Sequence, residues 1–135
     1  MLPSAKTPLN STCLCGSGRS YSECCQPYHL GEKTPATAEQ LMRSRYVAYA
    51  LKLEDYLLNT WAAETRPNDL EFEADLEWIG LSIKGRKQGK SRHKEGWVTF
   101  VAEYRIDLEK GQLEERSYFL RNEQNNWCYL EGDVS

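Results

Sequence analysis

The sequence contains no apolar run close to the length that a membrane helix requires. Such a helix needs about 20 consecutive apolar residues, and polar or charged side chains interrupt every apolar stretch of this 135-residue chain. The first eleven residues also lack the positively charged start and apolar centre of a signal peptide. These absences predict a cytoplasmic protein that has no membrane partner.

The chain also lacks a surplus of positive charge. Its 17 Lys and Arg residues are outnumbered by 20 Asp and Glu, which gives a net charge of −3 at pH 7. Nothing in this balance draws the whole molecule towards nucleic acid, so we expect no specific nucleic-acid partner. A basic cluster does occur between Lys84 and Lys94, but no aromatic residue interrupts it to stack bases. We interpret the cluster as a solvated hairpin tip, partly balanced by the acidic stretch Asp69–Glu77.

Histidine, the side chain that most often transfers protons in catalysis, is scarce. The chain has only His29 and His93, and neither falls on an element expected to line a cavity. No phosphate-binding loop, dinucleotide fingerprint or G-x-S-x-G motif is present. Glu103, Asp107 and Glu115 are candidate buried carboxylates, although strand alternation usually sends such residues to solvent. The sequence therefore favours a non-enzymatic role, and a small-molecule-processing enzyme is the alternative.

Cysteine, by contrast, is concentrated in one segment. Four of the five cysteines fall within 13 residues, as a C-x-C pair followed by CC: Cys13, Cys15, Cys24 and Cys25. Four thiolates this close can complete a tetrahedral zinc shell, and a reducing compartment favours metal over disulfides. Disulfides, another thiophilic metal and a redox switch are the alternatives. The fifth cysteine, Cys128, is interpreted as a small buried apolar residue.

Residues on either side of the cysteines also favour metal binding. Gly16 and Gly18 permit the positive-φ backbone that brings two sulfurs to one ion. Ser20–Glu23 fits a capping box, which predicts that Cys24 and Cys25 lie in the first turns of a short helix. The positive end of that helix would favour thiolate over thiol.

The rest of the chain predicts an α+β fold. A capping box at Thr37–Gln40 and helical spacing of apolar residues predict one helix after residue 37 and a shorter one over 53–61. Alternation over 70–78 favours a strand, with a short helix as the alternative. Further strands are predicted over 78–84, 97–107, 113–121 and 127–130, with turns at 85–89, 110–111 and 122–126. Helices followed by a meander of strands indicate a curved antiparallel sheet with helices packed on one face.

The cysteine segment resembles the SEC-C motif, a zinc module found at the tail of the bacterial preprotein-translocase ATPase. The shared pattern is C-x-C-G-S-G, a spacer, CC and then His-x-Gly, here His29–Gly31. The resemblance implies one structural Zn²⁺ bound by Cys13, Cys15, Cys24 and Cys25. His29 falls outside these ligand positions, and we interpret it as a packing or hydrogen-bonding residue. In the translocase the module is associated with chaperone and ribosome contacts, which implies a protein or ribosomal partner.

Three further segments, at 41–46, 56–61 and 115–119, resemble the YchJ family of small bacterial proteins. Together with the cysteine segment they cover most of residues 13–132. That family joins an N-terminal SEC-C module to a nuclear-transport-factor-2-like (NTF2-like) domain, a cone of helices against a strongly bent sheet. The resemblance implies a flexible arm over 1–12, the module and linker over 13–35, and the NTF2-like domain over 36–135. It implies no particular reaction.

Two sets of residues are candidates for binding. Side chains that could line a cavity of the cone, with an arginine to meet an anionic group of a small-molecule ligand, are Arg45, Trp61, Trp78, Tyr104, Phe119, Arg121, Trp127 and Tyr129; the alternative is that these aromatics are core. Side chains that could form an interaction surface around the zinc are Arg19, Tyr21, Gln26, Tyr28 and Lys33. Of Arg43 and Arg45, one is predicted to pair with a carboxylate and the other to be exposed. We therefore predict a zinc-binding accessory or adaptor protein, monomeric or weakly dimeric.

Overall fold

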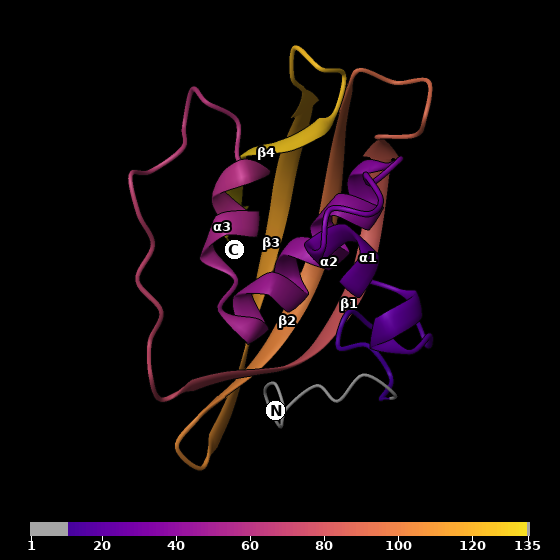
Figure 1. The fold of residues 1–135 in the computed structure, drawn as a ribbon. Helices are drawn as coiled ribbons and strands as arrows, with labels where there is room; N and C mark the ends of the chain where they lie inside the picture. The colour runs from indigo at the N-terminus through magenta and orange to yellow at the C-terminus, as the bar shows by residue number, and fades with distance from the viewer. Residues whose placement is uncertain (1–10, 135) are drawn as a thin grey trace.

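A computed structural model of the chain describes residues 11–134, so the predicted arm over residues 1–12 lies outside the described residues except for its last two positions. Four strands form one antiparallel sheet in the order β1-β2-β3-β4. They are β1 (Leu76–Gln88), β2 (Glu95–Ile106), β3 (Glu109–Arg121) and β4 (Trp127–Val134). The main helices lie on one face of this sheet (Figure 1). The predicted α+β class is confirmed.

The predicted strong curvature is not supported, because the sheet is not strongly curled (Figure 1). The central pairing of β2 with β3 runs without a break from Glu95↔Leu120 to Ile106↔Glu109. Register shifts occur only in the outer pairings of the described sheet, twice between β1 and β2 and once between β3 and β4. Since a bulge bends a strand locally, bending is confined to the outer strands and the central pair stays regular.

The predicted capping box opens the long helix α2 (Ala38–Leu51), which is followed by α3 (Glu54–Asn59). The Thr37 hydroxyl accepts a hydrogen bond from the Gln40 backbone N–H at 3.1 Å. In a regular capping box the Gln40 side chain would accept from the backbone N–H of Thr37. Here it accepts instead from the N–H of the preceding residue, Ala36, at 2.8 Å. α2 ends at Lys52, which has left-handed backbone geometry.

One predicted strand and one predicted turn were wrong in position. Residues 70–75, predicted as a strand by alternation, are irregular, and β1 begins only at Leu76. The turn predicted at 110–111 lies instead at Asp107 and Leu108, where Asp107 has a φ of 58°. Gly111 is part of β3, and a Cβ there would lie 2.7 Å from the Tyr104 ring. This glycine therefore makes room for an aromatic ring across the strand pair rather than a turn.

The basic side chains of the hairpin between β1 and β2 are exposed, as predicted for a solvated tip, and neighbouring elements also brace the hairpin. Glu39 of α2 forms ion pairs with both Arg43 and Arg86. Arg121 donates hydrogen bonds to the Ser91 and His93 carbonyls of the loop, at 2.7 and 2.8 Å. The predicted balance by the acidic stretch is not what this geometry shows, since the ion pair of that stretch joins Glu77 to Arg105 on the neighbouring strand.

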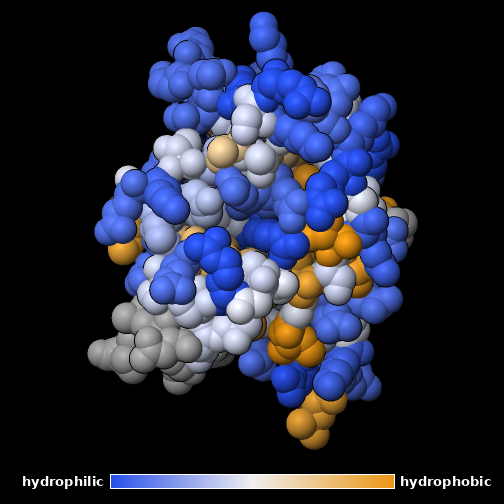
Figure 2. All heavy atoms as spheres, turned by 90° about the vertical axis from the view of Figure 1, so that its right-hand side faces the viewer, coloured by the Kyte–Doolittle hydropathy of each residue, from blue (hydrophilic) through white to orange (hydrophobic). Residues whose placement is uncertain are grey.

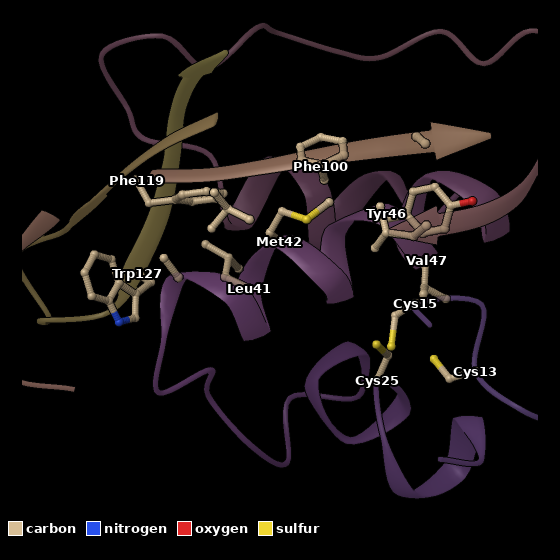
Figure 3. Close-up of a cluster of buried hydrophobic side chains, with 14 of the residues drawn as sticks. Cys13, Cys15, Cys25, Leu41, Met42, Tyr46, Val47, Phe100, Phe119 and Trp127 are labelled. Atoms are coloured by element: carbon tan, nitrogen blue, oxygen red, sulfur yellow. The ribbon is translucent and has the colours of Figure 1, made fainter. Parts of the chain in front are cut away.

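One hydrophobic core joins the cysteine segment to the rest of the molecule. Leu41 and Met42 of α2 lie towards Phe100 and Phe119 of the sheet, whereas Val47 lies beside Cys15 (Figure 3). Cysteines from the N-terminal segment belong to the same cluster of buried residues and approach α2 from its other side (Figure 3): Cys13, Cys15 and Cys25. The side of the molecule that carries β1 and α1 is mostly hydrophilic at its surface (Figure 2). α2 therefore lies between the cysteine segment and the sheet.

Candidate metal centre

Four sulfur atoms converge in the N-terminal segment. One sulfur from each of Cys13, Cys15, Cys24 and Cys25 lies within 4.8 Å of the other three. The Cys15–Cys24 and Cys24–Cys25 sulfur pairs are 3.5 and 3.9 Å apart. A tetrahedral zinc site with Zn–S bonds of about 2.3 Å requires sulfurs about 3.8 Å apart. All four cysteines are free thiols rather than disulfides, so the donor set fits a tetrahedral thiophilic metal.

Two glycines shape the first half of this site. Gly16 and Gly18 have φ values of 84° and 87°, in the region that side chains other than glycine rarely adopt. The turn is closed by a hydrogen bond of 2.7 Å from the Cys13 N–H to the Arg19 carbonyl. A Cβ at position 16 would lie 2.7 Å from the Leu81 carbonyl oxygen of β1. Gly16 therefore serves both the turn around the sulfurs and the close contact with the sheet.

The second half of the site differs from the prediction. Ser20 makes no side-chain cap, and a 3-10 helix η1 (Tyr21–Glu23) precedes Cys24. The α-helix α1 (Gln26–His29) starts only after Cys25, which is its N-cap residue. Pro27 lies in the first turn, where its missing N–H costs nothing. Cys24 and Cys25 thus occupy the bend between two short helices rather than the first turns of one.

Hydrogen bonds between the clustered cysteines shift the pKa values of their thiols. Hydrogen bonds from Cys13, then Cys25, lower the pKa of the Cys15 thiol far below its usual range. The hydrogen bond with Cys15 raises the pKa of Cys13 to about 12, and that with Cys13 raises the pKa of Cys25. Among these three thiols, the hydrogen bonds therefore favour the thiolate at Cys15 and the thiol at Cys13 and Cys25. A bound divalent cation would take the place of those protons and stabilise all four sulfurs as thiolates.

His29 connects this segment to α2, as a packing and hydrogen-bonding residue. Its Nε2 donates to the Ser44 carbonyl at 2.8 Å, because a carbonyl can only accept. Its Nδ1 then accepts from the Tyr21 hydroxyl at 2.7 Å. The Tyr56 ring of α3 packs edge-on against the imidazole at 4.9 Å. The prediction that His29 packs and bonds outside the ligand set is confirmed by these contacts.

Of the predicted surface residues, four reach the surface and one does not. Arg19 and Lys33 are exposed, and Gln26 and Tyr28 are half-buried. Tyr21 is only 6% exposed, since its ring packs in the core and its hydroxyl bonds to His29. Tyr21 therefore supports the module from within and cannot form part of its surface.

A separate cavity of 220 Å³ lies between α2 and the inner face of the sheet. Of the eight predicted lining residues, four line it: Arg45, Trp78, Phe119 and Tyr129. The other four lie elsewhere. Trp61 and Arg121 face an open hollow beside the β3–β4 turn, Tyr104 packs edge-on against Trp78, and Trp127 is core, with its indole N–H bonded to the Ala36 carbonyl.

Comparison with known proteins agrees with both parts of this architecture. The family model of the YchJ middle NTF2-like domain matches residues 37–132. The chain belongs to this family. The SEC-C motif matches residues 10–27, which include all four clustered cysteines.

Similar proteins span nearly the whole length of this YchJ-like chain. A UPF0225 protein of Cupriavidus pinatubonensis is 40% identical, covering 97% of this chain and 96% of its own. The solution structure of a SEC-C motif containing protein from Rhodopseudomonas palustris is similar with a TM-score of 0.78 and 32% identity, covering 91% of this chain and 98% of that one. The crystal structure of a SEC-C motif containing protein from Psychrobacter arcticus is similar with a TM-score of 0.76 and 27% identity. This match covers 94% of this chain and 84% of that one.

The prediction for Arg43 and Arg45 is right in one half and wrong in the other. Arg43 pairs with the Glu39 carboxylate as predicted, but Arg45 is 5% exposed and so is not the exposed partner. Glu115, one of the three candidate buried carboxylates, lines the cavity together with Arg45. Helical spacing did place Arg45 four residues after Leu41, on the inner side, and that spacing was the signal available for its burial.

In the described residues, no helix is long and apolar enough to cross a membrane.

Proposed function

We propose that this protein is a cytoplasmic zinc-binding adaptor, in which one structural Zn²⁺ holds the SEC-C module. The module supplies an interaction surface for a protein or ribosomal partner, and the chain is a monomer or a weak dimer. The observation that carries the proposal is the convergence of four free cysteine sulfurs within 4.8 Å. Zinc is favoured over other metals because an all-thiolate tetrahedral set is typical of structural zinc sites.

The zinc assignment is tested by a pair of cysteine variants. Cys24→Ser removes one ligand, so purified protein should lose most of its zinc and residues 13–31 should become sensitive to proteases. Cys128→Ala is the matched control, because Cys128 is buried on β4 and outside the cluster. Zinc content is measured by atomic emission and cleavage by mass spectrometry. A Cys24→Ser protein that keeps its zinc and its N-terminal protection would show that the ligand assignment is wrong.

The adaptor role is supported by the exposure of Arg19 and Lys33 beside a module held rigidly by metal. Its test is affinity capture from native lysate with RNA monitored, which compares the wild type with an Arg19→Glu, Lys33→Glu double variant. Lys110→Glu, an exposed change on β3, is the control. We expect the double variant alone to lose a captured protein or ribosomal partner. Capture that the double variant retains would contradict the surface, and capture of nothing would contradict the adaptor role.

The NTF2-like domain has a second part in the proposal, as a scaffold for the module or as a ligand pocket. The cavity between α2 and the sheet supports the pocket, because its walls combine aromatic rings with a few polar groups. The enzymatic alternative rests on the same cavity with a purely structural zinc. An enzyme of this kind requires a pair of groups that transfer protons. The charged side chains on the cavity wall are Arg45 and Glu115, so the enzymatic alternative depends on these two residues.

A further inference from the structure

Arg45 carries a buried positive charge that forms no ion pair within the described part of the chain, and the carboxylate that shares its cavity is Glu115. The residue is only 5% exposed. The ion pairs within residues 11–134 involve Arg43, Arg86 and Arg105, but not Arg45. Its guanidinium lies 4.9 Å from the Trp61 ring centre and 4.7 Å from that of Tyr129. These rings stabilise a cation only in part, so the site favours an anion.

Part of the guanidinium is committed to the protein. Nη1 donates to the Leu57 carbonyl at 2.8 Å and to the Thr60 hydroxyl at 2.7 Å, which caps the end of α3. Burial raises the pKa of the nearby Tyr49 phenol, although Arg45 opposes the rise, so this neighbour is a neutral group. Within residues 11–134, both hydrogen bonds of ordinary length and angle that Arg45 donates come from Nη1, and the Tyr49 hydroxyl is a further hydrogen-bonding neighbour of the guanidinium.

The Nη2 and Nε groups of Arg45 are its other hydrogen-bond donors. In the described residues, the side-chain atom that is both fully buried and unpaired is Arg105 Nε. The remaining N–H groups of Arg45 do not share this combination, and Arg45 is one of the residues that line the cavity. A guanidinium whose Nη2 and Nε donors face a ligand presents the fork that matches a carboxylate.

The other walls restrict the size and charge of a ligand. A cavity of 220 Å³ is smaller than the range of about 300–1,000 Å³ typical for drug-sized ligands, so it suits a single substituted ring. Trp78 and Phe119 provide aromatic walls, against which a ring can pack edge to face. Glu115 also lines the cavity and accepts a hydrogen bond from Ser117 at 2.8 Å. A second anionic group on the ligand would face this carboxylate, which favours a monoanion.

We propose that the cavity binds a small aromatic monocarboxylate, with its carboxylate on Arg45 and its ring between the sheet and α2. This rests on the ligand-pocket part of the proposed function and is independent of the zinc module and its partner.

The test is titration calorimetry of the full chain with benzoate and with benzyl alcohol, a neutral compound of similar size. Benzoate should bind about tenfold or more tightly than benzyl alcohol, the difference that one charge-assisted hydrogen bond supplies. Benzoate should also shift the Nε–H resonance of Arg45 in a ¹⁵N spectrum. Equal binding of the two compounds, or binding of neither, would overturn the proposal while leaving zinc content and partner capture as they were.

Three variants locate the site. Arg45→Gln should reduce benzoate binding to the level of benzyl alcohol, and Ala102→Leu, which fills the cavity from β2 and leaves Arg45 in place, should abolish both. Arg121→Gln is the matched control, because Arg121 also donates to carbonyls and lies 4.3 Å from a Trp127 ring centre, but outside the cavity. Loss of benzoate binding in Arg121→Gln, or full binding in a folded Ala102→Leu, would place the ligand elsewhere and overturn the assignment.

Discussion

His29 has both ring nitrogens hydrogen-bonded to neutral partners, which favours an uncharged imidazole. Nε2–H donates to the Ser44 carbonyl and Nδ1 accepts from the Tyr21 hydroxyl. A proton on Nδ1 would require the Tyr21 hydroxyl to turn and accept instead, and neither partner of the ring is a carboxylate that would stabilise the charge. Burial also lowers the pKa of His29 below its ordinary value of 6.5. The hydrogen bonds of this imidazole therefore connect the cysteine segment to α2 in a way that depends on pH.

The sign of this pH dependence follows from linkage. Below pH 6.5 the unfolded chain binds a proton at His29 that the folded chain resists, so stability conferred by the neutral ring is lost as pH falls. One such proton contributes at most about 1.4 kcal/mol per pH unit. We predict that His29→Gln is less stable than the wild type at pH 7.5 and that the difference narrows by pH 5.5.

Denaturant unfolding at both pH values, with the same excess of zinc, measures this difference. Protonation of the cysteines affects the wild type and the variant alike, so it cancels in the comparison. His93→Gln, in the hairpin loop, is the control for losing a histidine elsewhere. A gap between wild type and His29→Gln that stays constant or widens at low pH would contradict a neutral His29.

At the scale of elements, glycines decide how the first hairpin meets α2. Gly89 has a φ of 79°, and its carbonyl accepts from the Ala38 N–H at the start of the helix, at 2.8 Å. A Cβ on Gly96 would lie 2.4 Å from the Gly89 Cα, and one on Gly89 would lie 2.9 Å from the Ala38 Cβ. The two strands and the helix N-terminus therefore pack backbone to backbone.

We predict that Gly96→Ala destabilises the protein and Gly85→Ala does not. The added methyl at position 96 meets backbone atoms that cannot rotate away, and overpacking of this kind costs about 1–3 kcal/mol. Gly85 belongs to the same hairpin, but a Cβ there would meet nothing within 4 Å. Thermal unfolding followed by circular dichroism compares them. Equal melting temperatures for the two variants would show that the backbones at Gly96 and Gly89 can move apart with little loss of stability.

The glycines also show what the sequence could and could not predict. Alternation and turn residues gave the meander and most strand centres, and the turn at 122–126 is correct, with the Asn122 side chain accepting from two backbone N–H groups. The sequence pattern predicts turns at Gly85 and Gly111, but both lie inside strands: Gly85 at a bulge of β1, and Gly111 opposite the ring of Tyr104. A glycine that permits a turn and one that makes room for a neighbour look the same until the partner strand is known.

The same limit applied to the two candidate sites. The sulfur cluster was predictable because all four cysteines lie within 13 residues and their spacing alone indicates a metal site. The cavity was only half predictable, because its wall is assembled from α2 and all four strands of the described sheet through long-range packing. Arg45 and Tyr129 are 84 positions apart, and no local pattern shows that they meet.

At the scale of the whole molecule, the cysteine segment is part of the core. Cys13, Cys15 and Cys25 are almost fully buried in the same cluster as Leu41 and Val47. Arg43 of α2 donates to the Cys15 carbonyl, and His29 donates to that of Ser44. Removing residues 1–35 would therefore expose one side of α2, which is why point variants are better tests of the module than a truncation.

We predict that metal removal loosens α2 as well as the cysteine segment. Without the ion, the cysteine thiolates repel one another or take up protons and no longer hold residues 13–31 against the helix, and the buried side chain of Val47 loses part of its cover. Hydrogen exchange after chelation should therefore increase in residues 13–31 and in α2, and much less in β3 and β4, which pack on the far side of the core. Restoring zinc should restore protection in both regions. Increased exchange confined to residues 13–31 would mean that the segment is an appendage, and that its burial against α2 contributes little to the stability of the domain.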